Sequence, residues 1–214
     1  MITFLLGFFG YKDKKILNLY GTKNLLYLPY LIGYNIYSSR FYNKLPFGIY
    51  CFIGEQGSGK TLSLVYTALQ LKKKNYKNFY SNMTFEGFRP FNKLDSLTYV
   101  SDSIIICDEM GIVANSKTSK DVNADLLRFS AQNRKNSRIV LTSSQQLYMI
   151  HKDLRTQLRA CISCSKFGPL VINRYYKPVV DADGNISTAK MFKFSWFLAT
   201  EKLYNAYNTL EVIQ

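Results

Sequence analysis

Short runs of apolar residues alternate along this chain with longer stretches in which apolar residues recur at helical spacing. The apolar runs predict strands buried on both faces, and they are GIYCFI (48–53), SIIIC (103–107), RIVLTSS (138–144) and ACISCSKF (160–167). The stretches with helical spacing are TLSLVYTALQLKKK (61–74), VNADLLRFSAQNRKN (122–136) and QQLYMIHKDLRTQLR (145–159). Because strands and helices take turns, the pattern predicts an α/β fold whose mainly parallel central sheet is flanked by helices.

The two ends of the chain follow other patterns. Residues 1–46 are aromatic and lysine-rich, and we interpret them as an N-terminal extension of a domain that spans 47–214. Late in that domain, LVINRYYKPVV, the turn DADGN and TAKMFKFSWF predict a β-hairpin decoration at 170–197. NFYSNMTF (78–85) predicts a further strand, and TEKLYNAYNTL (200–210) predicts a short helix or an extended tail.

The segment GEQGSGKT follows the first buried strand and opens the first helix. It matches the phosphate-binding pattern G-x-x-x-x-G-K-[ST], and a chance glycine-rich turn would lack the strand before it and the helix after it. Glycines let backbone N–H groups approach phosphates, and the lysine and the hydroxyl serve the β- and γ-phosphates and Mg²⁺. We therefore predict a P-loop that binds ATP and Mg²⁺ through Gly54, Glu55, Gln56, Gly57, Ser58, Gly59, Lys60 and Thr61.

Two acids end the buried run SIIIC, in the segment SIIICDEMG. The carboxyl edge of a parallel sheet is where ligands bind, so we expect both carboxylates to face the P-loop. Asp108 is the predicted metal-shell ligand, and Glu109 is the predicted base for the attacking water. An adjacent Asp-Glu pair favours a hydrolytic ATPase over a switch GTPase, which positions its water with a glutamine. The alternative is a strand-end turn with a capping aspartate.

The segment QNRKNSRIVLTSSQ places basic residues before a strand and a glutamine after it. If this strand lies between the P-loop strand and the acidic strand, Gln145 reaches the γ-phosphate and can report its presence. Arg134 is the first candidate for insertion into a neighbouring subunit's site, where it would stabilise transition-state charge. The ordinary alternatives are solvated helix-end charges at Arg134 and Arg138 and a helix cap at Gln145.

The chain carries a formal net charge of +14 and a sequence pI of about 9.6. A triphosphate neutralises only part of this charge, so the excess indicates a polyanionic partner. Nucleic acid is the first candidate for this partner, and an acidic membrane surface is the second. The alternative is a basic surface without a partner. KTSK (117–120) would either line a DNA pore or form a solvated loop. An apolar fraction of 47% excludes a disordered chain.

The four cysteines do not form a disulfide pattern. Cys51 and Cys107 lie inside apolar runs, and the C-x-x-C pair Cys161 and Cys164 has no second cysteine pair or histidine pair to complete a zinc site. We interpret all four as strand thiols in a reducing cytoplasm, and we expect no catalytic role for His151. The apolar stretches ITFLLGFFG and NLLYLPYLIGYNIY are too short to span a bilayer, so no transmembrane helix is predicted.

The order GEQGSGKT, YSN, IIICDEMG and NRKNSRIVLTSSQ resembles the FtsK–HerA superfamily of ASCE or RecA-like P-loop ATPases. Within it, the chain is most similar to viral genome-packaging ATPases and to Zot-like phage assembly ATPases. The resemblance covers residues 48–167, with an echo of the family's Y-x-x-Y tail in LYNAYNTLE. It implies a homo-oligomeric ring, expected to be a hexamer, that threads DNA through non-specific phosphate contacts. It also implies a trans-acting arginine, and Arg134, Arg138, Arg155 and Arg159 all stay open for this role.

Three functions stay open at this point. We expect an ATP-driven translocase that packages a phage genome into a preformed capsid, because the sequence ends at residue 214 without the transmembrane helix common in Zot-like proteins. Capsid-vertex or viral membrane proteins would be its partners, in the host cytoplasm or on the virion, with peripheral membrane contact through residues 1–46. The alternatives are a Zot-like extrusion ATPase at the host membrane and a small-molecule kinase.

Overall fold

The computed structural model describes residues 45–73, 76–110, 124–150, 152–180 and 186–207. They belong to the second of two compact units, Tyr42–Gln214. The predicted extension falls almost wholly outside the described residues, as do the loop 117–120 and His151. The division of the chain into 1–46 and 47–214 therefore stays a prediction.

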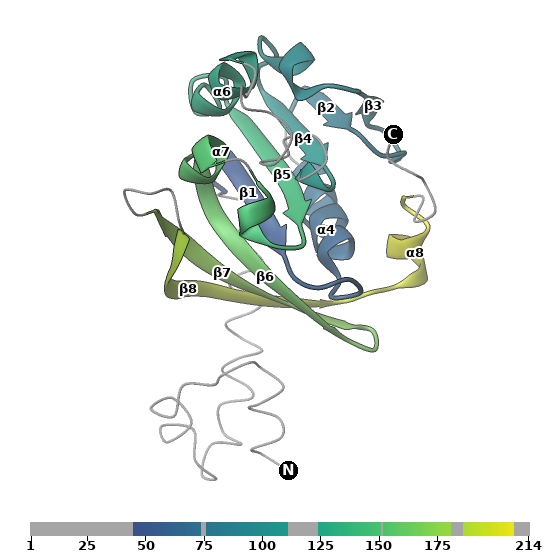
Figure 1. Cartoon of the computed structure of the whole chain (residues 1–214). Coiled ribbons are helices and arrows are strands. Elements are labelled where there is room, and N and C mark those ends of the chain that lie inside the picture. Colours follow the sequence, from purple (N-terminus) through teal and green to yellow (C-terminus); the bar gives the residue numbers. More distant parts are fainter. Residues whose placement is uncertain (1–44, 74–75, 111–123, 151, 181–185, 208–214) are drawn as a thin grey trace. The chain divides into compact units, whose positions relative to one another are not determined.

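One eight-stranded sheet organises this unit, with the strand order β3-β2-β4-β5-β1-β6-β7-β8 (Figure 1). Its parallel part runs from β3 to β6, and β7 and β8 continue it in the antiparallel sense. The strands are β1 (Gly48–Ile53), β2 (Asn78–Ser81), β3 (Arg89–Pro90), β4 (Ser103–Cys107), β5 (Arg138–Ser144), β6 (Leu158–Phe167), β7 (Leu170–Val180) and β8 (Ile186–Leu198). The predicted mainly parallel sheet and its C-terminal hairpin are confirmed.

Helices cover both faces of the parallel part, which explains why its strands read as continuous apolar runs. Helix α4 (Lys60–Lys72) packs against β1, β4 and β5. On the other face, α6 (Ala124–Ala131) and α7 (Lys152–Thr156) supply Phe129 and Leu154 to a core that includes Ile105 and Cys107 of β4 (Figure 1). The short elements are η3 (Leu94–Leu97), η4 (Leu147–Met149) and α8 (Glu201–Tyr204).

The segment 145–159 differs from the predicted helix. It forms two separate turns, η4 and α7, because Ile150 between them has an extended backbone (φ −86°, ψ 140°). Ile150 and Leu154 are both buried, at 0% and 1% exposure. The apolar spacing of this segment therefore reports burial against the sheet, and the turns let the chain return from the carboxyl end of β5 to the start of β6.

Candidate nucleotide site

The P-loop residues 54–61 connect the end of β1 to the start of α4, at the carboxyl edge of the sheet. Gly54, Gly57 and Gly59 have φ values of 152°, 78° and 86°, in the region that favours glycine. A Cβ on Gly54 would lie 3.0 Å from the Cys164 carbonyl oxygen, whereas one on Gly57 would meet nothing within 4 Å. The loop is thus packed at its base and open at its tip, as phosphate binding requires.

Two observations fit a nucleotide with its metal. The Ser58 hydroxyl oxygen is buried and has no hydrogen-bond partner among the described residues. Thr61 Oγ1 donates to Asp108 Oδ2 at 3.0 Å, so the hydroxyl and the carboxylate predicted to share Mg²⁺ already meet. Oxygen donors of this kind suit Mg²⁺, which neutralises phosphate charge when it is bound. Lys60 Nζ donates to the Glu55 carbonyl oxygen at 2.9 Å, inside the same loop.

Asp108 and Glu109 follow β4 and have contrasting surroundings. Asp108 is only 7% exposed, and Ser143 Oγ of β5 donates to its Oδ1. The same Ser143 oxygen accepts the Glu109 N–H at 2.9 Å. Glu109 itself is exposed and has a left-handed backbone, with φ 53°. Strand β5 thus fixes the buried carboxylate of Asp108 and the backbone of the exposed Glu109.

Asn82, the residue after β2, holds the backbone of Asp108 through a contact that the sequence did not reveal. Its Nδ2 donates to the Asp108 carbonyl oxygen at 2.9 Å, and its Oδ1 accepts the Asp108 N–H at 2.8 Å. The Asn82 N–H completes the link to β4 by donating to the Ile106 carbonyl oxygen at 3.2 Å. YSN was part of the resemblance, but only the adjacency of β2 and β4 gives its asparagine a function in positioning Asp108.

Strand β5 lies between β1 and β4, as the glutamine hypothesis requires. Ser144, its last residue, pairs with Ile53, the last residue before the P-loop. Gln145 follows directly and is exposed at this edge. Its position fits a γ-phosphate contact, and that function stays a prediction.

Arg134 lies at the opposite end of β5 from Gln145. Seven strand residues separate the two edges of the sheet, a distance of about 20 Å. Arg134 is exposed there, far from the P-loop of its own chain. Its function in trans also stays a prediction.

Arg138 is buried, contrary to both expectations for it. Its exposure is 0%, and its guanidinium donates to the carbonyl oxygens of Leu97, Thr98 and Phe129 at 2.7–3.0 Å. The guanidinium also lies 4.3 Å from the Phe129 ring centroid, and burial lowers the pKa of Arg138 to about 10. Arg138 therefore ties η3 and α6 to β5, and neither a solvated charge nor a trans-acting arginine describes it.

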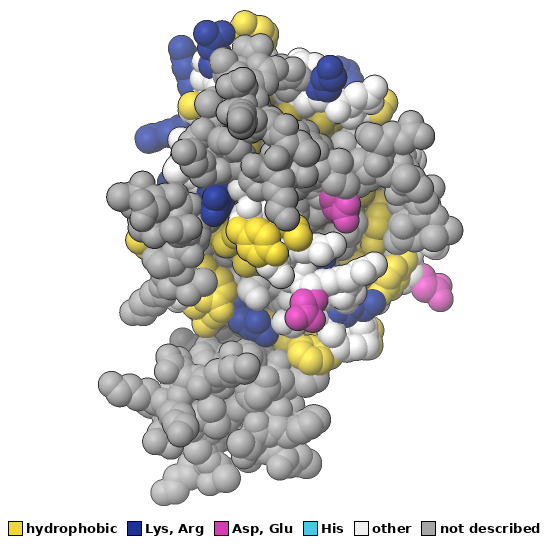
Figure 2. Space-filling view, in the orientation of Figure 1, with side chains coloured by type: hydrophobic (Ala, Val, Ile, Leu, Met, Phe, Trp, Pro, Cys, Tyr) yellow, Lys and Arg dark blue, Asp and Glu magenta, His cyan; other side chains and the backbone are white. Residues whose placement is uncertain are grey.

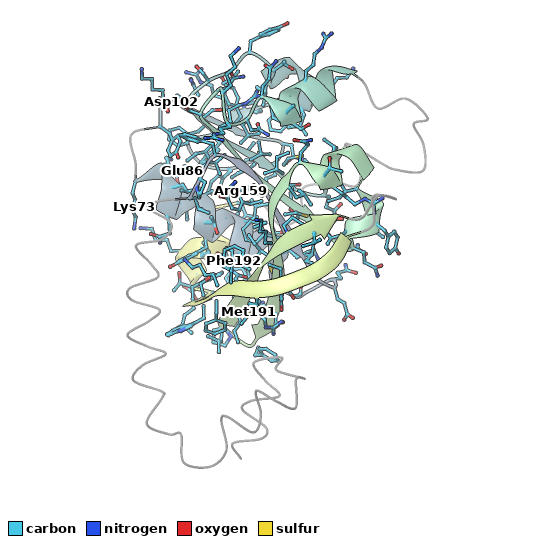
Figure 3. All side chains as sticks on the ribbon, turned by 90° about the vertical axis from the view of Figure 1, so that its left-hand side faces the viewer. Lys73, Glu86, Asp102, Arg159, Met191 and Phe192 are labelled. Carbon is cyan, nitrogen blue, oxygen red and sulfur yellow. The ribbon has the colours of Figure 1, made fainter. Side chains whose placement is uncertain are left out.

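The other two candidate arginines lie near the amino end of β6. Arg159, labelled in Figure 3, is the second residue of β6 and is exposed. A Cβ on Gly48 of β1 would lie 3.0 Å from the Arg159 Cβ. Arg155 ends α7 with its Nε buried and without a hydrogen-bond partner among the described residues. Neither lies at the P-loop edge of its own chain.

All four cysteines are buried free thiols. Burial raises the pKa of Cys107, Cys161 and Cys164 to about 12 and that of Cys51 well above its usual value. Cys161 and Cys164 lie three positions apart in β6, so their side chains point to opposite faces. The C-x-x-C pair therefore does not converge on one site.

The C-terminal tail reaches the site, beyond what its motif echo alone indicated. Tyr207 forms an isolated antiparallel bridge with Phe85, just past Asn82. Burial raises the pKa of Tyr207 to about 12, and the nearby negative charge of Asp108 adds to the effect. The Lys166 ammonium lies 5.3 Å from the centroid of the Tyr204 ring.

Among the described residues, no helix has the length and apolar character needed to cross a bilayer.

Comparison with known proteins gives structural matches only, since no protein-family model and no curated protein sequence matches the chain. The N-terminal domain of zonular occludens toxin from Neisseria meningitidis aligns over 76% of this chain and 100% of its own, with a TM-score of 0.50 and 16% identity. The flagellar accessory protein FlaH from Methanocaldococcus jannaschii aligns over 72% and 95%, with a TM-score of 0.47 and 13% identity.

The genome packaging NTPase B204 from Sulfolobus turreted icosahedral virus 2, in complex with AMPPCP, aligns over 68% of this chain and 98% of its own. Its TM-score is 0.49 and its identity 14%. The strand order, the P-loop and the toxin-domain match agree on the architecture. The described domain has the P-loop NTPase fold of the RecA-like type.

Proposed function

We propose that the chain is an ATP-driven motor that moves DNA and packages a viral genome into a preformed capsid. The observation that carries the hydrolytic part is the meeting of Thr61, Asp108 and Ser143 beside an exposed Glu109. Lys60 would exchange its loop carbonyl for the β- and γ-phosphates. Glu109 would accept the proton of the attacking water, and Gln145 would contact the γ-phosphate from the neighbouring strand.

The net charge of +14 supports DNA as the partner. Figure 2 shows basic side chains gathered over the α6 end of the domain, where Arg128, Arg134 and Lys135 are exposed. Contacts of lysine and arginine with phosphates release counterions, so binding should be independent of sequence and strongly dependent on salt. A small-molecule kinase would need no such surface.

The test is ATP hydrolysis by the full chain with and without linear double-stranded DNA, at low and at moderate salt. We expect DNA to raise the hydrolysis rate, and we expect this stimulation to fall steeply as salt increases. Lys60→Ala should abolish hydrolysis under all conditions. If DNA does not change the hydrolysis rate of the wild-type chain at any salt concentration, the motor function is contradicted. A DNA-independent NTPase or a kinase would then remain.

Extrusion of a phage genome at a membrane is the second candidate, favoured by the apolar segments ITFLLGFFG and NLLYLPYLIGYNIY. Flotation of the full chain with neutral and with anionic vesicles separates the two candidates. A packaging motor should float only weakly and lose this binding at moderate salt. Tight, salt-resistant flotation that requires residues 1–46 would favour extrusion.

A further inference from the structure

Residues 199–207, here called the C-terminal strap, are anchored at three points. The Ala199 N–H donates to the Pro169 carbonyl oxygen at 2.7 Å, which fixes the start of the strap to the β6–β7 turn. Leu203 in its middle is 5% exposed. Tyr207 pairs with Phe85 just past the end of β2, on the other side of the site. The strap therefore runs from the β6–β7 turn to the β2 side of the sheet.

The first half of the strap is connected to the P-loop through Lys166. Lys166 links the two, because its Cβ is 3.4 Å from the position of a Cβ on Gly59 and its ammonium is 5.3 Å from the Tyr204 ring centroid. Helix α8 also packs against α4, whose first residue is Lys60 (Figure 1). A partly exposed aromatic ring thus lies at the ammonium of Lys166, whose Cβ packs at the glycine that precedes the phosphate-binding helix.

We propose that Tyr204 is the stacking platform for the base of the bound nucleoside triphosphate. The P-loop and Asp108 fix the phosphates at one end, so the base must lie away from Asp108. The strap presents Tyr204 to Lys166, which packs at Gly59, whereas Tyr207 pairs with Phe85 past the end of β2, the strand beside β4. This inference rests on the proposed nucleotide binding, but it does not depend on DNA translocation.

Stacking also predicts the specificity of the site. An aromatic ring recognises the π face that every base presents, so it favours nucleotides over bare phosphates without selecting one base. We therefore expect ATP and GTP to bind with similar affinity, and we expect both to depend on Tyr204 to the same degree.

The experiment compares the binding of ATP, GTP and tripolyphosphate, by competition against a ribose-labelled fluorescent ATP, in the full chain and its variants. Tyr204→Ala should weaken ATP and GTP about tenfold or more, since base–aromatic stacking has effects of that size, and should leave tripolyphosphate unchanged. Tyr204→Phe retains the ring and should bind like the wild type. Tyr99→Ala is the matched control, because Tyr99 is 92% exposed in another part of the domain.

Two results would overturn the platform. In one, Tyr204→Ala weakens tripolyphosphate as much as ATP, which would mean that the strap only supports the P-loop. In the other, Tyr204→Ala binds ATP as the wild type does. Tight ATP binding through Tyr204 without any response of hydrolysis to DNA would retain the platform and overturn the motor function instead.

Discussion

The backbone of Glu109 is left-handed, with φ 53°, which costs a residue with a Cβ about 1–2 kcal/mol. Its neighbours hold this conformation, because Ser143 accepts the Glu109 N–H and Asn82 makes two hydrogen bonds to the Asp108 backbone. The bend turns consecutive carboxylates to different surroundings, one buried beside Thr61 and one exposed. The bend therefore separates the proposed metal ligand, Asp108, from the proposed base, Glu109.

Glu109→Gln should retain ATP binding and lose turnover. The amide keeps the size and the backbone contacts of the glutamate but cannot accept the proton, and general bases contribute about 100-fold or more to rates. Single-turnover hydrolysis and ATP affinity, measured on the same preparation, check this prediction. Hydrolysis close to the wild-type rate would remove Glu109 from the position of base.

Asn82→Ala should lower kcat about 10- to 100-fold while the Kd for ATP stays within about twofold, because the hydrogen bonds of Asn82 go to the backbones of Asp108 and Ile106 and none goes to the described P-loop residues. Asn78→Ala is the matched control, since Asn78 begins β2, which Asn82 follows, and donates to the Ser101 carbonyl oxygen at 3.0 Å. Equal losses in both variants, or a loss confined to ATP affinity, would show that Asn82 only stabilises β2.

The place and backbone of the P-loop could be predicted from the sequence, because its contiguous pattern specifies its own turn between a strand and a helix. Asn82 and Ser143 escaped prediction because their functions depend on which strand lies beside β4. The two predictions for Arg138, a solvated charge and a trans-acting arginine, were wrong for a related reason. An arginine at a strand start is ordinarily solvated, and only the packing of η3 and α6 supplies the carbonyl oxygens that bury it.

At the scale of elements, the order of β1, β4 and β5 was predictable, because each of their apolar runs is followed by candidate nucleotide-binding residues. The segment 145–159 was not, because buried turns and a buried helix give the same apolar spacing. The β7–β8 hairpin was predicted from its turn signal. The sequence pattern did not predict which side chains of the hairpin are buried. Phe192 and Val179 are exposed and Lys193 is buried.

Lys193 makes the stability of the hairpin depend on pH. It is 5% exposed, with its ammonium 5.6 Å from the Tyr175 ring centroid, and burial lowers its pKa to about 7. The unfolded chain, with a lysine pKa of about 10.4, binds more protons between these values, so this residue makes stability rise with pH from 7 to about 10. Relative to Lys193→Met, the wild-type Tm should therefore rise across that window.

Thermal melts of both proteins from pH 7 to 10 check the prediction, and the comparison cancels the contributions of thiols and phenols that the two share. Lys177→Met, which alters an exposed lysine of β7, supplies the control. A difference between wild type and Lys193→Met that does not change with pH would contradict the account of Lys193.

At the scale of the whole molecule, Arg134 and the P-loop occupy opposite edges of the sheet. A trans-acting Arg134 therefore requires head-to-tail contact between subunits, the type of interface that closes into rings. Arg134→Ala and Lys60→Ala should each be inactive, and their mixture should regain hydrolysis, because each supplies what the other lacks. Lys177→Ala, at an exposed lysine of β7 outside the basic surface around α6, should retain activity alone. A mixture that stays inactive would exclude Arg134 as the trans-acting residue.

The most direct measurement of the central claim is ATP-driven displacement of a third strand from triplex DNA by the full chain. A motor that moves along double-stranded DNA should release the third strand only with hydrolysable ATP. The Glu109→Gln variant should bind ATP but should not release the third strand. Release should also slow as added salt weakens phosphate contacts. Hydrolysis of ATP with no strand release, under conditions where the chain binds DNA, would contradict translocation.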